Sequence, residues 1–496
     1  MLFAAAYWCF DLAVLRGGVP HPLDDLWEYA LVARHLLEDG RWHTSMIYPP
    51  LWPLRDTATM TVPVLVHGPL LPVVLAGLLA VAPPSAVDAF AWFGAACATL
   101  ATIPLLRLGS RAFGAPVGVA AALIFTLAPL TLQAVHHSAS VVAAALLLLI
   151  ALEAAERERP RPILAAWAAA ATWLLRPELL VVVPILAWRI ARPLGDPPSR
   201  ESNRWRRAAV FLAAFAAGAA PWWWHCAAAG GSPLFNLSAY SAIGYWGGRP
   251  GHSVLQDFSL PPSLWTAMLA AALPTLWTKW LAFLPRALKH ALFAPGGGVG
   301  ALMVPGLAAA FGAPGSRPAV AAAAAIALMP VATMTVFFHQ MLYVMPVLGL
   351  YAVAAALGAR WLAGLLPARA RGPRVWIGGL VLLALPATVA ALRTGAEEGE
   401  RARRLIADER AALAATAAPD RTRRVLFTDR AGFASWTTGR PSIWISAQGF
   451  LSLYRDGGAE ASRRGLPAAP DALDGWFHAG HWAPGEPLKV RPTPGR

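Results

Sequence analysis

Long apolar segments recur along most of this chain, and they constrain its fold more than any other feature. A run of about 20 apolar residues is long enough to cross roughly 30 Å of hydrocarbon. Hydrophobic residues make up 57% of the chain and charged residues only 14%, whereas a soluble domain is about half apolar and a quarter charged. We therefore predict a polytopic membrane protein.

The apolar runs are rich in Ala, Leu and Val and seldom alternate with polar residues, which favours helices over a barrel. They fall near residues 2–16, 62–82, 86–106, 116–135, 138–154, 161–175, 177–190, 207–225, 263–285, 299–312, 317–337, 340–359 and 374–392. A full crossing by residues 62–82 or 263–285 would move basic connectors to the wrong side of the membrane. We expect these two runs to be interfacial or re-entrant, and the fold class to be an all-α membrane protein with about 11–13 transmembrane helices.

Four basic connectors orient the predicted helices, because the positive-inside rule assigns them to the cytoplasm. They are residues 107–114, 156–162, 189–207 and 359–374. The N-terminus is then cytoplasmic and the C-terminus extracytoplasmic. The segments on the outer side are residues 17–61, 136–140, 226–262, 338–341 and the tail after 393. The richness in Ala, Arg and Pro is typical of GC-rich bacteria, so we expect a multi-pass protein of a bacterial plasma membrane.

Charge and cysteine content exclude several other classes. The net charge of +14 follows from Arg residues between the apolar runs, and no aromatic nucleic-acid motif accompanies them, so no nucleic-acid partner is expected. The three cysteines, Cys9, Cys97 and Cys226, have no paired spacing and predict neither a disulfide framework nor a zinc site. The opening run carries Asp11 and lacks a small-residue cleavage site, so it does not resemble a cleaved signal peptide, and its shortness leaves open a true start upstream.

The last hundred residues differ in character from the rest. Residues 393–415 alternate charges at helical spacing and predict an exposed helix. The segments "RVLFTD" (424–429) and "PSIWIS" (441–446) predict two short strands around a helix in "RAGFASWTTG". We predict two domains: a multi-span transmembrane module over 1–392 with an outer loop at 17–61, and a small extracytoplasmic α/β appendage over 393–496.

Residues 23–42, "LDDLWEYALVARHLLEDGRW", place two adjacent carboxylates just after the first apolar run. A helix over 25–38 would align Asp25, Tyr29, Val32 and Leu36 on one face, with Asp24 or Leu23 as its cap. A solvated acidic first turn is the alternative explanation.

Polar residues at the other outer helix ends favour a functional role for these carboxylates. A charge at mid-bilayer costs roughly 2.5–3.5 kcal/mol, so acidic, basic and phenolic groups gathered at one level predict an outward-facing cavity. Each alone could instead be an interface anchor. Adjacent His136 and His137 cannot form a metal site by themselves, and a structural role is favoured for them. The polar residues at these outer helix ends are His67, His136, His137, Arg176, Glu178, Asn236, Tyr240, His339, Gln340 and Tyr343.

These motifs resemble the GT-C class of integral-membrane glycosyltransferases, which includes lipid A aminoarabinose transferases and protein O-mannosyltransferases. The signature after the first span matches Asp25, Tyr29, Ala30, Arg34, Leu37, Gly40 and Trp42. A branch with a paired Asp-Asp is similar at Asp24, Asp25, Ala33, Arg34 and His35. Further likenesses follow in order along the chain: "HGPLLP", with His67 where many members have Lys, then "LRPELL", "PWWWHCAAAGGSPLFN", "MLYVMPVLGL" and "LFTDRAGFASWTTGRPSIWI".

The resemblance implies transfer of a sugar from a polyprenyl-phosphate donor to a lipid, glycan or protein acceptor at the outer face of the membrane, with inversion at the anomeric carbon. Asp25 or Asp24 would act as general base. Arg176 and His67 would stabilise the phosphate, with Tyr343 as a hydrogen-bond donor. Other expected substrate-binding residues are Glu178, Gln340, Tyr29 and His137. No cofactor is expected, and dependence on a divalent metal is left open.

Two other function classes remain at this point. A transporter or flippase of lipid-linked sugars would place functional charges at mid-span and show a pseudo-repeat, whereas this chain concentrates polar residues at outer helix ends. A non-catalytic membrane assembly subunit would leave Asp24 and Asp25 as ordinary loop residues.

Overall fold

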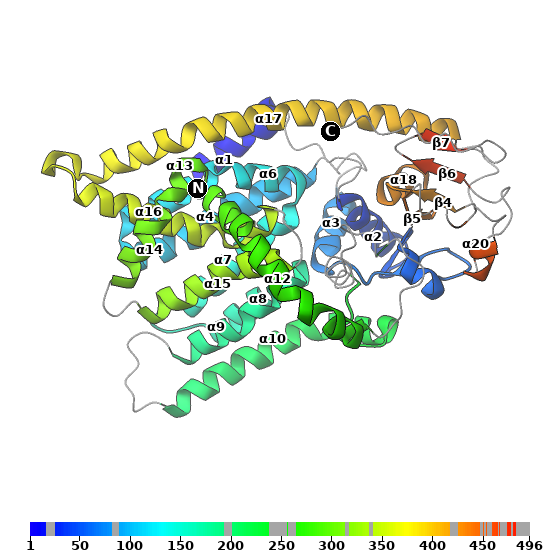
Figure 1. Cartoon of the computed structure of the whole chain (residues 1–496), viewed down its shortest axis with the longest axis horizontal. Coiled ribbons are helices and arrows are strands. Elements are labelled where there is room, and N and C mark those ends of the chain that lie inside the picture. Colours follow the sequence, from blue (N-terminus) through cyan, green and yellow to red (C-terminus); the bar gives the residue numbers. More distant parts are fainter. Residues whose placement is uncertain are drawn as a thin grey trace.

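The computed structural model has a bundle of helices at one end and a smaller part with a β-sheet at the other (Figure 1). It describes residues 1–15, 25–81, 89–192, 201–237, 255, 264–312, 317–336, 341–416, 425–446, 450, 453, 459–464, 466, 474–477 and 480–482.

The bundle helices follow the apolar runs of the sequence. They are α1 (Leu2–Cys9) with the π-helical turn η1 (Phe10–Val14), α4 (Ala89–Phe113), α5 (Ala115–Leu127), α6 (Pro129–His137), α7 (Ala139–Ala155), α8 (Pro162–Leu175), η4 (Pro177–Val181), α9 (Val182–Ala191), α10 (Glu201–Gly230), α12 (Leu264–Phe293), α13 (Gly297–Ala301), α14 (Met303–Gly312), α15 (Arg317–Val336), η7 (Met341–Val347) and α16 (Leu348–Gly364). Their Ala-rich faces let the backbones approach closely, and α7 is buried along most of its length.

Among the described residues, three helical segments are long and apolar enough to cross a membrane: Phe90–Phe113, Met341–Gly364 and Pro373–Ala411. Two bent pairs qualify when each is taken as one span, α5 with α6 (51°) and the segment Trp277–Phe293 with Gly297–Gly312 (109°). Pro129 starts α6 at the first bend, as expected for a residue that lacks a backbone N–H. A multi-pass membrane protein is supported, while the number of 11–13 spans stays a prediction.

Helix α3 (Leu70–Val81) occupies only part of the 62–82 run. Its 12 residues extend about 18 Å at 1.5 Å per residue, which is too short to cross roughly 30 Å of hydrocarbon. It packs against α2 (Leu26–Glu38) beside the bundle. The interfacial position expected from the sequence stays a prediction.

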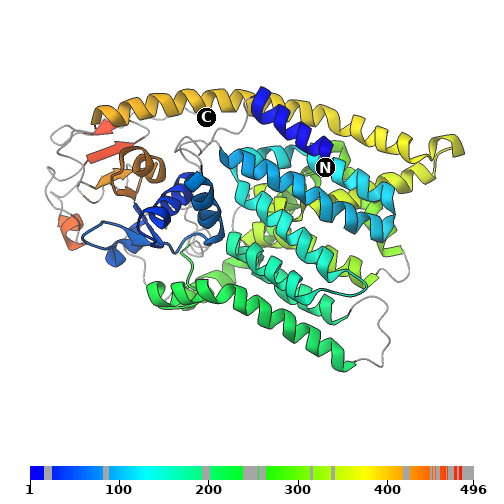
Figure 2. The ribbon, with the colours of Figure 1, turned by 180° about the vertical axis from the view of Figure 1, so that it is seen from behind.

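One helix connects the two parts of the molecule. Helix α17 (Pro373–Thr416) runs along one long side from the bundle to the sheet, opposite α10 in both views (Figures 1 and 2). The last apolar run and the charged segment that follows it are therefore continuous, and the predicted boundary at 392/393 lies inside a helix. Gly395 at this junction faces the ring of His136, where a Cβ would lie only 2.8 Å from the imidazole Cε1.

The smaller part contains a five-stranded sheet in the order β2-β5-β4-β6-β7. The strands are β2 (Met46–Ile47), β4 (Leu426–Thr428), β5 (Ser442–Trp444), β6 (Asp474–Phe477) and β7 (Gly480–Trp482). The expected strands in "RVLFTD" and "PSIWIS", with helix α18 (Ala431–Thr438) between them, are confirmed. Strand β2 comes from the first outer loop and pairs in parallel with β5, so the C-terminal region shares its sheet with residues near the N-terminus.

The first loop, which in the structure includes the described residues 25–69 before α3, contacts α18 and α10. The ring of Trp27 on α2 packs 5.0 Å from that of Phe433 on α18. On the other side, the His225 Nε2 of α10 lies 3.0 Å from the carbonyl oxygen of Val64, and Trp42 packs against Trp222.

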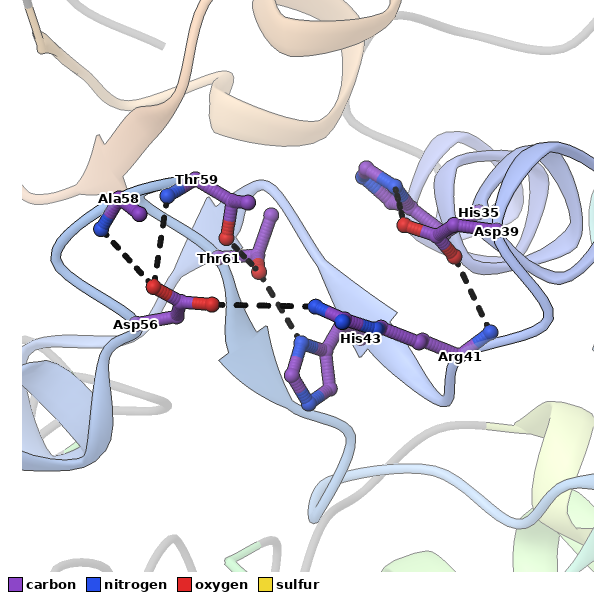
Figure 3. Close-up of polar contacts among 8 residues, drawn as sticks. All are labelled: His35, Asp39, Arg41, His43, Asp56, Ala58, Thr59 and Thr61. Atoms are coloured by element: carbon purple, nitrogen blue, oxygen red, sulfur yellow. Dashed lines mark hydrogen bonds and ion pairs between the residues drawn. The ribbon is translucent and has the colours of Figure 1, made fainter.

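Within the loop, strands β1 (His43–Thr44) and β3 (Val62–Pro63) form an antiparallel pair. Figure 3 shows the polar contacts that close this hairpin. The Asp56 carboxylate accepts the amides of Ala58 and Thr59, and the hydroxyl of Thr61 bridges Thr59 and the ring of His43. The loop is thus a folded platform next to the bundle.

Candidate active site

Asp25 lies at the N-terminus of helix α2, immediately before its first residue, Leu26. Asp25 is the N-cap residue, it is exposed, and its side chain makes no capping hydrogen bond. The expectation that Asp24 or Leu23 would cap this helix is therefore wrong, because the chain enters helical geometry already at Asp25. Asp24 lies outside the described residues.

One turn further along α2, Glu28 is a buried carboxylate that is only 3% exposed. The Tyr48 hydroxyl donates a hydrogen bond of 2.6 Å to its Oε2, and the His67 Nε2 lies 3.1 Å from the same oxygen. Its Oε1 is buried and has no hydrogen-bond partner among the described residues. Buried carboxylates are costly unless paired, so this arrangement requires the cation and the phenol that surround it.

A second cation–carboxylate pair lies where α8 ends. The Arg176 guanidinium contacts the Glu178 Oε1 through Nε at 2.6 Å and Nη2 at 2.5 Å. It also lies over the ring of Tyr343, 5.0 Å from the centroid. Pro177 disfavours helical geometry at the preceding residue, and Arg176 adopts an extended backbone conformation as the C-cap of α8.

The aromatic ring of Tyr29 connects the two pairs. It lies 4.9 Å from the His67 ring, and both Arg176 and Asp25 are near enough to influence its ionisation. We name the whole group the first-loop cluster. Its members are Asp25, Glu28, Tyr29, Tyr48, His67, Arg176, Glu178 and Tyr343.

Burial and charge set the protonation of this cluster. Burial favours neutral His67, but Glu28 and Asp25 outweigh it, so the pKa of His67 is raised above its usual value near 6.5. Burial, followed by nearby carboxylates, raises the pKa values of Tyr29 and Tyr48 well above 10. Both phenols therefore stay protonated and can donate hydrogen bonds.

The structure thus brings together most of the predicted site residues that it describes: Asp25, Tyr29, His67, Arg176, Glu178 and Tyr343. Sequence reasoning missed Glu28 and Tyr48. The available signal was a carboxylate inside an otherwise apolar helical segment, "LWEYALVA", one turn after Asp25. Because a Glu in a first helical turn is usually solvated, that signal was weak.

The two adjacent histidines lie against other helices. The His136 Nε2 is 2.6 Å from the Asp11 Oδ2 of η1, and both side chains are buried. The His137 Nε2 is 3.5 Å from Glu398 on α17. Packing against helices explains both, which agrees with the structural role favoured for them over a metal site, whereas the substrate contact expected of His137 stays a prediction.

Three other residues considered in the sequence, Tyr240, His339 and Gln340, lie outside the described residues, whereas Asn236 lies within them. Among the residues that the structure describes, no group of three or more His, Cys, Asp and Glu side chains could hold a metal ion. The absence of a cofactor stays a prediction.

Comparison with known proteins identifies the fold. No protein-family model and no curated protein sequence matches the chain. Among solved structures it is similar to ArnT from Cupriavidus metallidurans bound to undecaprenyl phosphate, with a TM-score of 0.54, 13% identity, and coverage of 94% of this chain and 88% of ArnT.

A second group of similar structures comes from an archaeon. The oligosaccharyltransferase of Archaeoglobus fulgidus, in complex with Zn and sulfate, gives a TM-score of 0.56 at 13% identity, over 90% of this chain and 62% of the archaeal one. AglB from the same organism, in complex with an inhibitory peptide and a dolichol-phosphate, gives 0.54 at 14% identity, over 89% and 63%. The expected resemblance is confirmed at the level of architecture: the chain has the fold of the GT-C integral-membrane glycosyltransferases.

Proposed function

We propose that this protein transfers a glycosyl group from a polyprenyl-phosphate-linked sugar to an acceptor at the outer face of a bacterial plasma membrane. One observation carries the proposal: an exposed carboxylate that makes no capping hydrogen bond, Asp25, lies near the Glu28–His67 pair and the half-buried Arg176–Glu178 pair. A base next to cations and phenols is the arrangement that displacement of a phosphate leaving group requires.

Asp25 would act as the general base. Its carboxylate accepts the proton of the acceptor hydroxyl as the acceptor oxygen forms a bond to the anomeric carbon. The bond between that carbon and the phosphate oxygen breaks on the opposite side, and its electron pair leaves with the lipid phosphate. The configuration at the anomeric carbon is therefore inverted.

Arg176 and His67 would stabilise the charge that gathers on the leaving phosphate. Arg176 presents its guanidinium from the end of α8 and is held over the ring of Tyr343. Charge-assisted hydrogen bonds to phosphate are among the stronger polar contacts. The binding of undecaprenyl phosphate by ArnT, which has a similar fold, supports this class of donor.

No observation in the described structure favours a transporter or an assembly subunit. Several cluster residues lie at helix ends and in the first loop, whereas a transporter is expected to place its substrate site near mid-membrane.

Transfer assays with the purified full-length protein test the proposal. The protein in lipid nanodiscs is given radiolabelled polyprenyl-phosphate pentoses and hexoses with a membrane extract as acceptor, and labelled products are separated from donor. We expect transfer with at least one donor. In Asp25→Asn the rate of transfer should fall by about 10²–10⁴-fold, the usual contribution of a general base.

The matched control is Asp39→Asn, which changes an exposed carboxylate at the other end of α2 and should leave transfer unchanged. Transfer by Asp25→Asn at the wild-type rate would exclude this role for Asp25. Failure of the wild-type protein to release or transfer sugar from every donor would exclude the enzyme function itself.

A further inference from the structure

Glu28 and His67 form an ion pair whose two members differ in exposure. The Glu28 side chain is 3% exposed and the His67 side chain 19% exposed. The Tyr48 hydroxyl and the His67 Nε2 share the Glu28 Oε2, while the buried Oε1 has no hydrogen-bond partner among the described residues. His67 is therefore the more accessible partner of a buried carboxylate.

Three segments near His67 contribute charged or phenolic groups. Helix α2 supplies Asp25, Glu28 and the ring of Tyr29. The segment after β2 supplies Tyr48, which reaches the shared carboxylate, and the end of α8 supplies Arg176.

The balance of these groups favours protonated His67. Burial and the Arg176 charge oppose the protonated ring, but the carboxylates of Glu28 and Asp25 dominate, and the pKa of His67 is raised. Arg176 by contrast keeps its charge at every accessible pH. His67 is therefore the only one of the two proposed phosphate-binding cations whose charge can change near neutral pH.

We propose that binding of the lipid phosphate is linked to protonation of His67, and that Glu28 is the positioning residue that holds the proton there. This inference rests on the proposed function, which makes the cluster the site of the donor phosphate.

The physical reason is the charge of His67, which decides whether the phosphate meets a positive group or the negative Glu28 carboxylate. With His67 protonated, the imidazolium lies between two anions, the Glu28 carboxylate and the incoming phosphate, and attracts both. With His67 neutral, the Glu28 carboxylate acts on the phosphate without an intervening positive charge. Because charges interact more strongly in a poorly solvated site than in water, this change of sign should be visible as weaker binding at high pH.

Binding of a simple phosphodiester measures the linkage without requiring the donor sugar. The probe is a farnesyl methyl phosphodiester, which carries a single negative charge across the range from pH 5 to 9. Its Kd for the detergent-purified full chain is measured over that range. We expect the Kd of the wild-type protein to increase about tenfold or more from the acidic to the alkaline limit. A tenfold change corresponds to an uptake of at most about 0.5 proton per probe bound in the transition.

Three variants separate linkage from a merely structural role. His67→Lys retains a positive charge and should bind the probe with little pH dependence below pH 9. Glu28→Gln removes the carboxylate that holds the proton, so the midpoint of the pH dependence should move to lower pH by about one unit or more. His43→Gln changes a histidine of the same loop that lies outside the cluster, and should retain the wild-type profile.

The imidazole itself can be followed as a second measurement. Histidine-labelled protein, with the His67→Gln spectrum used for assignment, gives the titration of His67 by NMR in wild type and in Glu28→Gln. Parallel Kd profiles for wild type and His67→Lys, or an unmoved His67 titration in Glu28→Gln, would overturn the inference. A pH-independent Kd in a protein that still transfers sugar would refute this linkage alone, whereas absence of both transfer and probe binding would refute the proposed function.

Discussion

Gly68 lies directly against the carbonyl oxygen of Leu174, so closely that a Cβ at position 68 would overlap this oxygen. Gly68 follows His67, and Leu174 lies two residues before Arg176. The absence of a side chain at this one position therefore lets the first loop reach the end of α8, and brings the two proposed phosphate-binding cations into one site.

Substitution Gly68→Ala should push the first loop away from α8. The new methyl group would meet backbone rather than a flexible side chain, so the strain cannot be relieved by a rotamer change. We expect a lower Tm and at least about tenfold weaker binding of undecaprenyl phosphate, which corresponds to roughly 1.4 kcal/mol. The control is Gly77→Ala on α3, where a Cβ has open space. Equal binding by both variants would show that the close approach is not needed.

Replacement of Arg176 by Lys should weaken donor binding although the charge is retained. Lys lacks the planar fork that contacts Glu178 and stacks on Tyr343. Loss of one hydrogen bond to a charged group costs roughly 1.5–3 kcal/mol, or about 10- to 100-fold in Kd. Arg369→Gln, at an exposed position of the 359–374 connector, is the control that should bind normally. An unchanged Kd for Arg176→Lys would mean that charge alone is sufficient.

Tyr48→Phe should destabilise the protein through the buried carboxylate of Glu28. The substitution removes the hydroxyl that donates the 2.6 Å hydrogen bond to Oε2, and a buried acceptor left without its donor costs about 1–3 kcal/mol. Thermal unfolding in detergent would report this as a lower Tm. In Tyr7→Phe the lost hydroxyl is buried and has no hydrogen-bond partner among the described residues, so this variant should unfold close to the wild-type temperature. The interpretation fails if the two variants unfold together.

The raised pKa of His67 makes its contribution to stability depend on pH. The folded protein binds this proton more tightly than the unfolded chain does, so the contribution is complete below the unfolded pKa of about 6.5 and is lost as pH rises through the higher folded-state pKa. His67→Gln should therefore lower Tm more at pH 6 than at pH 9, relative to wild type. A difference in Tm that is the same at both pH values, or larger at pH 9, contradicts this sign.

Glu409 of α17 forms an ion pair with Arg430, the N-cap residue of α18. Removing one partner should destabilise the protein more than removing both. Both side chains are buried, and removing one partner of a buried pair typically costs about 3–5 kcal/mol, whereas replacing both with apolar residues is often nearly neutral. We expect Arg430→Met to unfold at lower temperature than Arg430→Met combined with Glu409→Leu. If the double variant is the less stable of the two, an unpaired Glu409 carboxylate is not what destabilises Arg430→Met.

Local sequence patterns were sufficient to predict many of the elements. Apolar runs predicted the helices of the bundle, because a helix satisfies its own backbone hydrogen bonds and needs no partner in hydrocarbon. Helix α2, strands β4 and β5, and helix α18 were predicted from periodicity and turn residues in the same way. The polar residues at the ends of the helices predicted that His67, Arg176 and Tyr343 would meet.

Tertiary structure decided the rest. Strand β2 has only two residues and becomes a strand because β5 offers it an edge, a pairing between positions about 400 residues apart that no local pattern contains. Helix α17 continues past Gly395, where any side chain would meet the ring of His136. A Glu in the first turn of a helix is usually exposed to solvent. Glu28 is instead buried in the folded protein, where Tyr48 and His67 contact its carboxylate. The sequence determines which side chains can carry a charge. The free energy of burying that charge, and the groups that it can bind, depend on which distant residues replace the water around it.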